Sequence, residues 1–306
     1  MRIIITGAGG FVGRRLIEKL PSHDIVGIDT SHSSFPDNVN VTEITGDLCE
    51  AGTLKAAFSE GCDAVIHLAT IPGGAAEQNP ALAKKINIDA TMKCIDYAAS
   101  LGSCPRFIFA SSIAVFGDTL PNTIDDNSPT VPKMLYGGHK LMMEQWIATL
   151  TRRGVIDGIS LRLSGVVARP KGPSGMKSAY LSDVFHDIKA NKKNTIPVSK
   201  HSTCWLSSVN RAASNFIHAL SADLSTATPE RAITLPTLRV TMEDMVTEIA
   251  RQTGTTPSLV SYKPDSKLEA AFGSQPPVTT HAADKLGFKS DQNLTNLVKN
   301  TLNGLR

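Results

Sequence analysis

Short apolar runs and stretches of helical periodicity alternate along the first 165 residues. The apolar runs are rich in β-branched residues and predict strands at residues 3–6, 25–29, 41–44, 64–68, 107–110 and 159–163. The stretches between them predict helices at residues 11–20, 53–58, 83–101 and 136–153. Strands separated by helices indicate βαβ crossovers, and runs that are apolar on both faces indicate a buried parallel sheet.

Beyond about residue 166 the pattern loosens. Pro170, Gly172, Pro173 and Gly175 predict a flexible loop. Helices are predicted at residues 178–190, 209–220 and 242–253, the last closed by Gly254, and a strand at residues 232–234. We therefore expect an α/β fold: a Rossmann-type, doubly wound parallel sheet over residues 1–165, with residues 205–235 packed back onto it. Residues 166–204 and 236–306 form a smaller C-terminal α/β substrate-binding region.

Composition narrows the classes of function. The net charge of +3 over 306 residues is too small and dispersed to indicate a nucleic-acid partner, and no run reaches the roughly 18 apolar residues of a membrane span. The N-terminus predicts a strand and not a secretory signal. Five scattered cysteines without a C-x-x-C pair indicate reduced thiols and a cytoplasmic protein. The eight histidines show no ligand spacing, so we predict no metal.

The stretch ITGAGGFVG places Gly7, Gly10 and Gly13 between a predicted strand and a predicted helix, which is the setting of a dinucleotide-binding turn. The first glycine permits the tight turn, the second admits a pyrophosphate, and the third lets the helix pack closely. The N–H groups of Gly10, Phe11 and Val12 open the helix and would face the phosphates. The alternative interpretation is an ordinary glycine turn that binds no dinucleotide.

Asp29 ends the second predicted strand, twenty residues after Gly9. A carboxylate there can accept both ribose hydroxyls and would repel a 2′-phosphate. Residues 30–34 contain no Arg or Lys that would favour that phosphate. If the glycines bind a dinucleotide, NAD is therefore favoured over NADP; otherwise Asp29 is a loop residue.

The segment YGGHK places Tyr136 and Lys140 four residues apart at a helix start, hence on one face. A free tyrosine has a pKa of about 10 and is a poor base. A neighbouring ammonium favours the phenolate and lowers that pKa. Ser112 ends a strand twenty-four residues upstream of Tyr136 and brings a hydroxyl to the ligand-binding edge of the sheet. Chance surface residues are the alternative for a Y-x-x-x-K spacing alone.

Several further segments resemble one family nearly end to end: TGAGGFVG, GDL, HLAT, INIDAT, FASSIAVFG, YGGHK and DKLGF. On these motifs the chain resembles the extended short-chain dehydrogenases/reductases, the NAD-dependent epimerase/dehydratase family. The resemblance implies a catalytic set of Ser112, Tyr136, Lys140 and Asn87. It implies NAD contacts from Gly7, Gly10, Phe11, Val12, Asp29, Asp47, Leu48, Leu68, Ala69, Thr70, Asn87, Tyr136, Lys140, Ser164 and Val166.

The substrate is narrowed by one departure from the family pattern. Gly165 stands where nucleotide-sugar members carry an Asn that helps to hold the substrate diphosphate, which counts against such a substrate. The segments GGAAEQN, RRGVIDGISLRLSGVVARP and CWLSSVNRAA are similar to the D-erythronate dehydrogenase subgroup. That likeness implies NAD-dependent oxidation of a small sugar acid, or of a related polyol or hydroxy acid, at a secondary hydroxyl. Ser112 would bind this hydroxyl, and Tyr136, kept ionised by Lys140, would remove its proton.

Substrate contacts are expected from Arg169 to a carboxylate, and from the backbone of Gly73 and Gly74; an exposed Arg169 is the alternative. Trp205 either lines the pocket or belongs to the core. Phe116 replaces a family Tyr and would make that edge of the pocket more apolar, and His139 is expected in solvent.

The family resemblance also suggests a homodimer formed through the helices at residues 83–101 and 136–153. Two alternative functions remain: a nucleotide-sugar epimerase or reductase, and a non-catalytic NAD-binding sensor. Relatives of the second kind typically lack the Tyr or the Lys, whereas Tyr136 and Lys140 are both present here.

Overall fold

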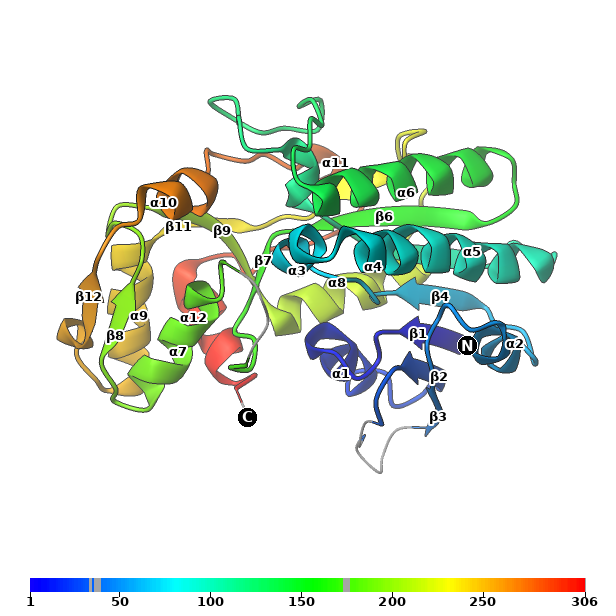
Figure 1. The fold of residues 1–306 in the computed structure, drawn as a ribbon, viewed down its shortest axis with the longest axis horizontal. Helices are drawn as coiled ribbons and strands as arrows, with labels where there is room; N and C mark the ends of the chain where they lie inside the picture. The colour runs from blue at the N-terminus through cyan, green and yellow to red at the C-terminus, as the bar shows by residue number, and fades with distance from the viewer. Residues whose placement is uncertain (33–34, 36–39, 173–176, 306) are drawn as a thin grey trace.

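A seven-stranded sheet forms the centre of the computed structural model, which describes residues 1–32, 35, 40–172 and 177–305 (Figure 1). The predictions made for residues 33–34, 173 and 175 lie outside these ranges. All strand pairs of the sheet are parallel, in the order β10-β6-β5-β4-β1-β2-β3. The bounds are β1 (Arg2–Thr6), β2 (Asp24–Asp29), β3 (Asn40–Thr45), β4 (Ala64–His67), β5 (Arg106–Ser112), β6 (Asp157–Leu163) and β10 (Ala232–Thr234). The chain direction across the sheet reverses between β1 and β4, where open α/β sheets bind ligands at their carboxyl ends.

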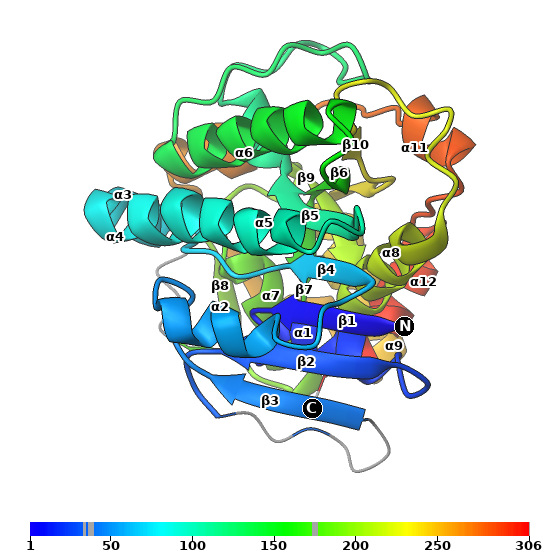
Figure 2. The ribbon, with the colours of Figure 1, turned by 90° about the vertical axis from the view of Figure 1, so that its right-hand side faces the viewer.

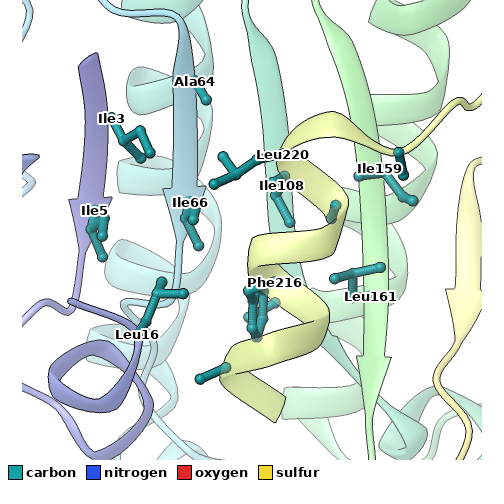
Figure 3. Close-up of a cluster of buried hydrophobic side chains, with 14 of the residues drawn as sticks. Ile3, Ile5, Leu16, Ala64, Ile66, Ile108, Ile159, Leu161, Phe216 and Leu220 are labelled. Carbon is teal, nitrogen blue, oxygen red and sulfur yellow. The ribbon is translucent and has the colours of Figure 1, made fainter. Parts of the chain in front are cut away.

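Helices cover both faces of this sheet and bury the apolar side chains that its strands carry on each side. Ile4, Phe107 and Phe109 face α2 (Ala51–Ala57), α5 (Thr91–Ser100) and α6 (Leu135–Arg152). The other face packs against α1 (Phe11–Ile17) and α8 (Val209–Ser221). Figure 3 shows Phe216 and Leu220 of α8 lying among side chains of β4, β5 and β6. Each such fully buried side chain contributes about 1.5–3 kcal/mol.

The helix predicted at residues 83–101 is three shorter elements, and a further helix, α3 (Gly73–Gln78), precedes them. The three are α4 (Pro80–Lys84), the π-helical turn η1 (Lys85–Ala90) and α5. Asn79 causes the first break, because it ends α3 and its side-chain Oδ1 accepts a hydrogen bond from Leu82 N at 3.1 Å, with Pro80 next in the chain. The wide turn η1 then rotates Asn87 towards the end of β4.

The C-terminal region forms its own small sheets beside the main sheet (Figures 1 and 2). One is β11-β9-β7 and the other β12-β8, with bounds β7 (Gly165–Val167), β8 (Asn194–Ile196), β9 (Thr203–Ser208), β11 (Leu238–Thr241) and β12 (Val260–Tyr262). A second core lies among these strands and the helices α7 (Tyr180–Lys189), α9 (Met242–Thr253) and α12 (Leu294–Leu302). The chain therefore has two hydrophobic centres.

Residues 205–235 divide between these two layers. The strand β10 extends the main sheet by pairing with β6, and α8 packs on its core. The strand β9 pairs instead with β7 and β11, while Trp205 of β9 packs against Val115 and Phe116 of the Rossmann layer. Short elements that the sequence did not indicate complete the fold: η2 (Ile113–Phe116), η3 (Pro257–Leu259), α10 (Ser266–Phe272) and α11 (His281–Lys285).

Candidate active site

The glycine turn after β1 has no room for side chains. Gly7 has a φ of +70°, and a Cβ there would lie 2.9 Å from Ala69 N. A Cβ on Gly13 would lie 2.3 Å from Gly7 O, so the helix could not pack on its own turn. Gly10 is exposed and begins α1 without a capping side chain, which leaves the first N–H groups of the helix available. This cradle, which a Cβ would fill, suits a dinucleotide pyrophosphate.

Asp29 fixes this cradle at the end of β2. Its Oδ2 accepts a hydrogen bond from Gly9 N at 2.9 Å, and its Oδ1 accepts one from Thr30 N at 2.8 Å. Each carboxylate oxygen keeps a second lone pair for a ribose hydroxyl. Nearby, Asp47 accepts a hydrogen bond from Cys49 N at 2.8 Å, which lowers the pKa of Asp47, and Leu48 is buried. The expected adenosine-side residues thus lie at the carboxyl ends of β2 and β3.

Asn87 is buried and supports the loop after β4. Its Oδ1 accepts hydrogen bonds from Ile71 N at 2.7 Å and Thr70 Oγ1 at 3.0 Å, and its Nδ2 donates to Ile71 O at 3.0 Å. The side chain of Asn87 thus holds this loop, and the expected catalytic and cofactor contacts of Asn87 stay predictions. Asn87 positions the loop of Leu68, Ala69 and Thr70, and the wide turn η1 that aims it there leaves no simple sequence signal.

Tyr136 and Ser112 meet at the carboxyl edge of the sheet. Tyr136 is the second residue of α6, and Ser112 is the last residue of β5. Burial raises the pKa of Tyr136, while the positive charge of Arg169 and a hydrogen bond with Ser112 act in the opposite direction. The phenol therefore has a hydroxyl and a cation beside it.

Lys140 lies close to the ring of Tyr136. Its Nζ is 5.5 Å from the ring centre of Tyr136 and 4.5 Å from that of Phe109. Burial lowers the pKa of Lys140 to about 7, and Glu144 opposes that shift. The expected role of Lys140 in keeping Tyr136 ionised stays a prediction. Arg169 is a further cation that opposes the rise in the pKa of Tyr136 caused by burial.

Arg169 follows β7 and reaches the site from the C-terminal region. It is partly buried, so the alternative of an exposed arginine is excluded, and the interaction with Tyr136 is mutual. Its Nε donates to Val166 O at 3.4 Å. A cavity of about 60 Å³ beside it has walls from β7 and from the start of α7, including Ser178, Ser182 and Asp183. A cation and hydroxyl groups therefore face the same hollow.

Gly73 lies next to the same tyrosine. A Cβ on Gly73 would lie 4.0 Å from the Cβ of Tyr136 and 3.2 Å from Cε of Met134. Gly73 and Gly74 open α3, so the structure brings this glycine pair to the site edge.

The structure places three other residues named for the pocket, and for Trp205 it favours the core alternative. Trp205 is 1% exposed, and its Nε1 donates to Pro276 O at 2.7 Å, so it belongs to the core. Phe116 is buried with its ring 5.3 Å from the Arg162 guanidinium carbon, so it does not line a pocket edge. His139 is 8% exposed and not in solvent, because α3 and α4, which the sequence did not resolve, pack over the start of α6.

The segment after β6 leaves little room at the position of the missing family asparagine. A Cβ on Gly165 would lie 3.0 Å from Cδ2 of Leu206 and 3.1 Å from Trp205 O, so these neighbours would have to shift slightly to admit a side chain. Ser164 accepts a hydrogen bond from Thr237 Oγ1 at 2.8 Å. Val166 is buried and packs against Phe11 and Val12 of α1. Of the two predicted cofactor contacts in this segment, Val166 thus lies against the helix that follows the glycine turn.

Over the ranges that the structure describes, no group of three or more His, Cys, Asp or Glu side chains is placed to hold a metal. In the same ranges, none of the helices has the length and apolar character needed to cross a membrane. Cys49, Cys62, Cys94, Cys104 and Cys204 are free thiols.

Comparison with known proteins places this site in a family. The profile of the NAD dependent epimerase/dehydratase family matches residues 3–206. The chain belongs to this family. Among curated proteins, it is 31% identical to D-erythronate dehydrogenase of Haemophilus influenzae, over 98% of each chain. It is 27% identical to D-erythronate dehydrogenase of Cupriavidus necator, over 98% of this chain and 97% of the relative.

Solved structures agree with this assignment. A crystal structure described as the nucleoside-diphosphate-sugar epimerase from Agrobacterium tumefaciens has a TM-score of 0.91 at 27% identity, over 100% of this chain and 95% of that one. A GalE-like L-threonine dehydrogenase from Cupriavidus necator, at 21% identity, has a TM-score of 0.88 over 100% of both chains and shows the shared fold. The predicted family and Rossmann-type fold are confirmed, and the family implies an enzyme with a nicotinamide cofactor.

Proposed function

We propose that this chain is an NAD-dependent dehydrogenase that oxidises a secondary hydroxyl of a small sugar acid, resembling D-erythronate, to the 2-oxo acid. The observation that carries the proposal is the cation beside the phenol: Arg169 lies within electrostatic reach of Tyr136, which is paired with Ser112. A guanidinium suits the carboxylate of a hydroxy acid because its planar donors match two oxygens. Two curated relatives named D-erythronate dehydrogenase support this substrate class.

In the proposed oxidation, each residue of the site has a separate role. Ser112 donates a hydrogen bond to the substrate oxygen, and Tyr136 accepts the hydroxyl proton. Arg169 binds the carboxylate and favours the phenolate form of Tyr136. The bound nicotinamide dinucleotide supplies the hydride acceptor.

NAD is the proposed dinucleotide. The carboxylate of Asp29 stands at the end of β2 and already holds the glycine turn through Gly9 N. It would accept the ribose hydroxyls and repel a 2′-phosphate. Contacts to NAD are assigned to the glycine cradle of Gly7, Gly10, Phe11 and Val12, to Asp47 and Leu48, to the loop of Leu68, Ala69 and Thr70, and to Tyr136, Lys140, Ser164 and Val166.

We also propose a cytoplasmic homodimer. The outer face of α6 exposes Met142 by 54% and Trp146 by 38%, and Leu82 of the neighbouring α4 is 41% exposed. Adjacent large apolar side chains on two packed helices form a surface that a second copy could cover. The reduced state of the five cysteines fits the cytoplasm.

The competing function is a nucleotide-sugar epimerase or reductase, which the description of the Agrobacterium tumefaciens structure favours. The glycine at position 165 opposes it, because it offers no side chain to hold a diphosphate and a Cβ there would contact Leu206 and Trp205 O tightly.

A substrate panel tests the proposal. Erythronate, threonate and a nucleoside-diphosphate sugar are each incubated with NAD and with NADP, and the absorbance of the reduced cofactor is followed. We expect oxidation of D-erythronate with NAD, and a loss of at least about a hundredfold in the Tyr136→Phe variant. Turnover of the nucleoside-diphosphate sugar, with none of the acids oxidised, would contradict the proposal.

A further inference from the structure

A buried charge cluster lies below the phenol of Tyr136. Glu144 of α6 is 1% exposed, and its Oε1 accepts hydrogen bonds from Arg162 Nε at 2.9 Å and from Ser111 Oγ. Its Oε2 accepts a hydrogen bond from Arg162 Nη2 at 2.8 Å. Arg162 belongs to β6 and Ser111 to β5, so two strands hold this one carboxylate. The guanidinium of Arg162 thus binds both carboxylate oxygens in a fork-like pair, which is a strong form of charge-assisted hydrogen bonding.

Lys140 lies between this carboxylate and the phenol. Tyr136, Lys140 and Glu144 follow at intervals of four residues and therefore share one face of α6. The amine is 2% exposed and has the ring faces of Phe109 and Tyr136 as neighbours. Without a counter-charge, this burial strongly favours the neutral amine.

The other titratable groups around Lys140 do not supply that counter-charge. His67 of β4 is fully buried, and burial and Lys140 lower its pKa to about 3, so it is neutral at physiological pH. Arg162 and Arg169 are cations, and His139 of α6 is a neutral neighbour whose pKa burial lowers. Glu144 is the group that opposes the loss of charge on Lys140.

Binding of an acidic substrate makes the phenolate of Tyr136 depend on the positive charge of Lys140. A carboxylate that pairs with Arg169 neutralises much of the positive field that favours the Tyr136 phenolate. The phenol then depends on the second cation, 5.5 Å from its ring centre, which is Lys140.

We propose that Glu144, held by Arg162 and Ser111, is a positioning residue that keeps Lys140 charged beneath Tyr136 while an acidic substrate occupies Arg169. This inference rests on the proposed oxidation of a hydroxy acid. Glu144 does not touch the reacting atoms; it acts through Lys140.

The charge of Lys140 can be measured without substrate or cofactor. The chain is labelled with ¹³C at lysine Cε and titrated by NMR, and the Lys140 signal is identified by its loss in Lys140→Met. In the parent protein we expect a midpoint near 7. In Glu144→Gln the midpoint should fall by about one pH unit, because the opposing charge is gone. In Arg162→Gln it should stay or rise, because Glu144 loses its competing partner.

Glu144→Gln leaves Arg162 buried without a counter-charge, so it is compared with Glu144→Gln/Arg162→Gln, which removes both charges together. The double variant should also show a lowered midpoint. A purely structural salt bridge would change the melting temperature and leave the Lys140 midpoint in place. An unchanged Lys140 midpoint in both Glu144→Gln and Glu144→Gln/Arg162→Gln would overturn the inference.

A second readout separates this inference from the proposed function. In a chain that oxidises D-erythronate, Glu144→Gln should lower kcat more than it changes KM at neutral pH and move the acid limb of the kcat profile upward. If the NMR shift is found but no sugar acid is oxidised, the charge relationship holds and the proposed substrate is wrong. If the sugar acid is oxidised and the acid limb does not move, the role of Glu144 is overturned while the function stands.

Discussion

Arg169 and Tyr136 interact electrostatically although they lie 33 residues apart in the chain: burial raises the pKa of the phenol and the guanidinium opposes that rise, while burial lowers the pKa of the guanidinium and the phenolate opposes that fall. Arg169 comes from the end of β7 in the C-terminal region, and Tyr136 from the first turn of α6 on the Rossmann layer. The site is therefore assembled only when the two regions pack together.

Arg169→Gln should weaken the use of an acid and spare that of a neutral alcohol. A charged hydrogen bond is worth about 1.5–3 kcal/mol, which corresponds to roughly a 10- to 100-fold loss in kcat/KM for D-erythronate. The acid limb of the pH profile should also move upward, because the phenol loses a cation. Arg169→Lys is the charge-conserving control, and erythritol is the uncharged substrate. Equal losses on acid and polyol would assign Arg169 to the phenol alone.

Two adjacent glycines of α6 should respond to alanine in opposite directions. A Cβ on Gly137 would lie 2.3 Å from Ala114 O, next to the turn that follows Ser112, whereas a Cβ on Gly138 meets nothing within 4 Å. Gly137→Ala should destabilise by about 2 kcal/mol or more. Gly138→Ala should stabilise by about 0.5–1 kcal/mol, because alanine is the better helix former. Urea unfolding of both variants checks the pair, and equal effects would contradict the packing of α6 on η2.

Lys140 should make the protein more stable as the pH rises. Its pKa is about 7 in the folded chain, below the ordinary lysine value of 10.5, so between these values the unfolded chain binds more protons. The penalty of burying the ammonium is fully present below pH 7 and is relieved as the pH rises towards 10.5, by roughly 5 kcal/mol in total. The free energy of unfolding of Lys140→Met, measured beside the parent, should lack this rise; parallel curves would contradict the burial of a titrating amine.

Trp146→Glu should convert the proposed dimer to a monomer. Trp146 and Met142 stand one turn apart on the outer face of α6, and a charge placed in an apolar interface would remain unpaired. Light scattering reports the mass, and Lys133→Glu, away from this face on an exposed residue, is a control for added negative charge. A parent protein that is already monomeric would end the proposal.

Local patterns predicted the parts of this fold that local forces decide. The strands β1 to β6 occur where β-branched runs stand, and α9 covers its predicted residues and ends at Gly254 with a φ of +69°. The three glycines of the cradle were recognisable because a strand, a turn and a helix follow one another within a few residues. The short C-terminal helices were missed, because five to nine residues carry too little periodicity.

Contacts between residues far apart in the chain determine the features of the site that the sequence did not predict. The π-helical turn directs the side chain of Asn87 to Ile71, a contact that the sequence motif does not predict. Trp205 is a core residue because the segment at Pro276 covers it. The pKa of Lys140 depends on Phe109 and Glu144, which a Y-x-x-x-K spacing does not reveal. These are contacts between separate elements, so their effect appears only after folding.

Transfer of an isotope tests the proposed reaction most directly. D-erythronate carrying deuterium at C2 is incubated with the protein and NAD, and the reduced cofactor is analysed by mass spectrometry. We predict that the deuterium appears in the nicotinamide, that a 2-oxo acid forms in equal amount, and that Tyr136→Phe abolishes both. Recovery of D-erythronate with its deuterium intact and no reduced cofactor would contradict the assignment of this site to hydroxy-acid oxidation.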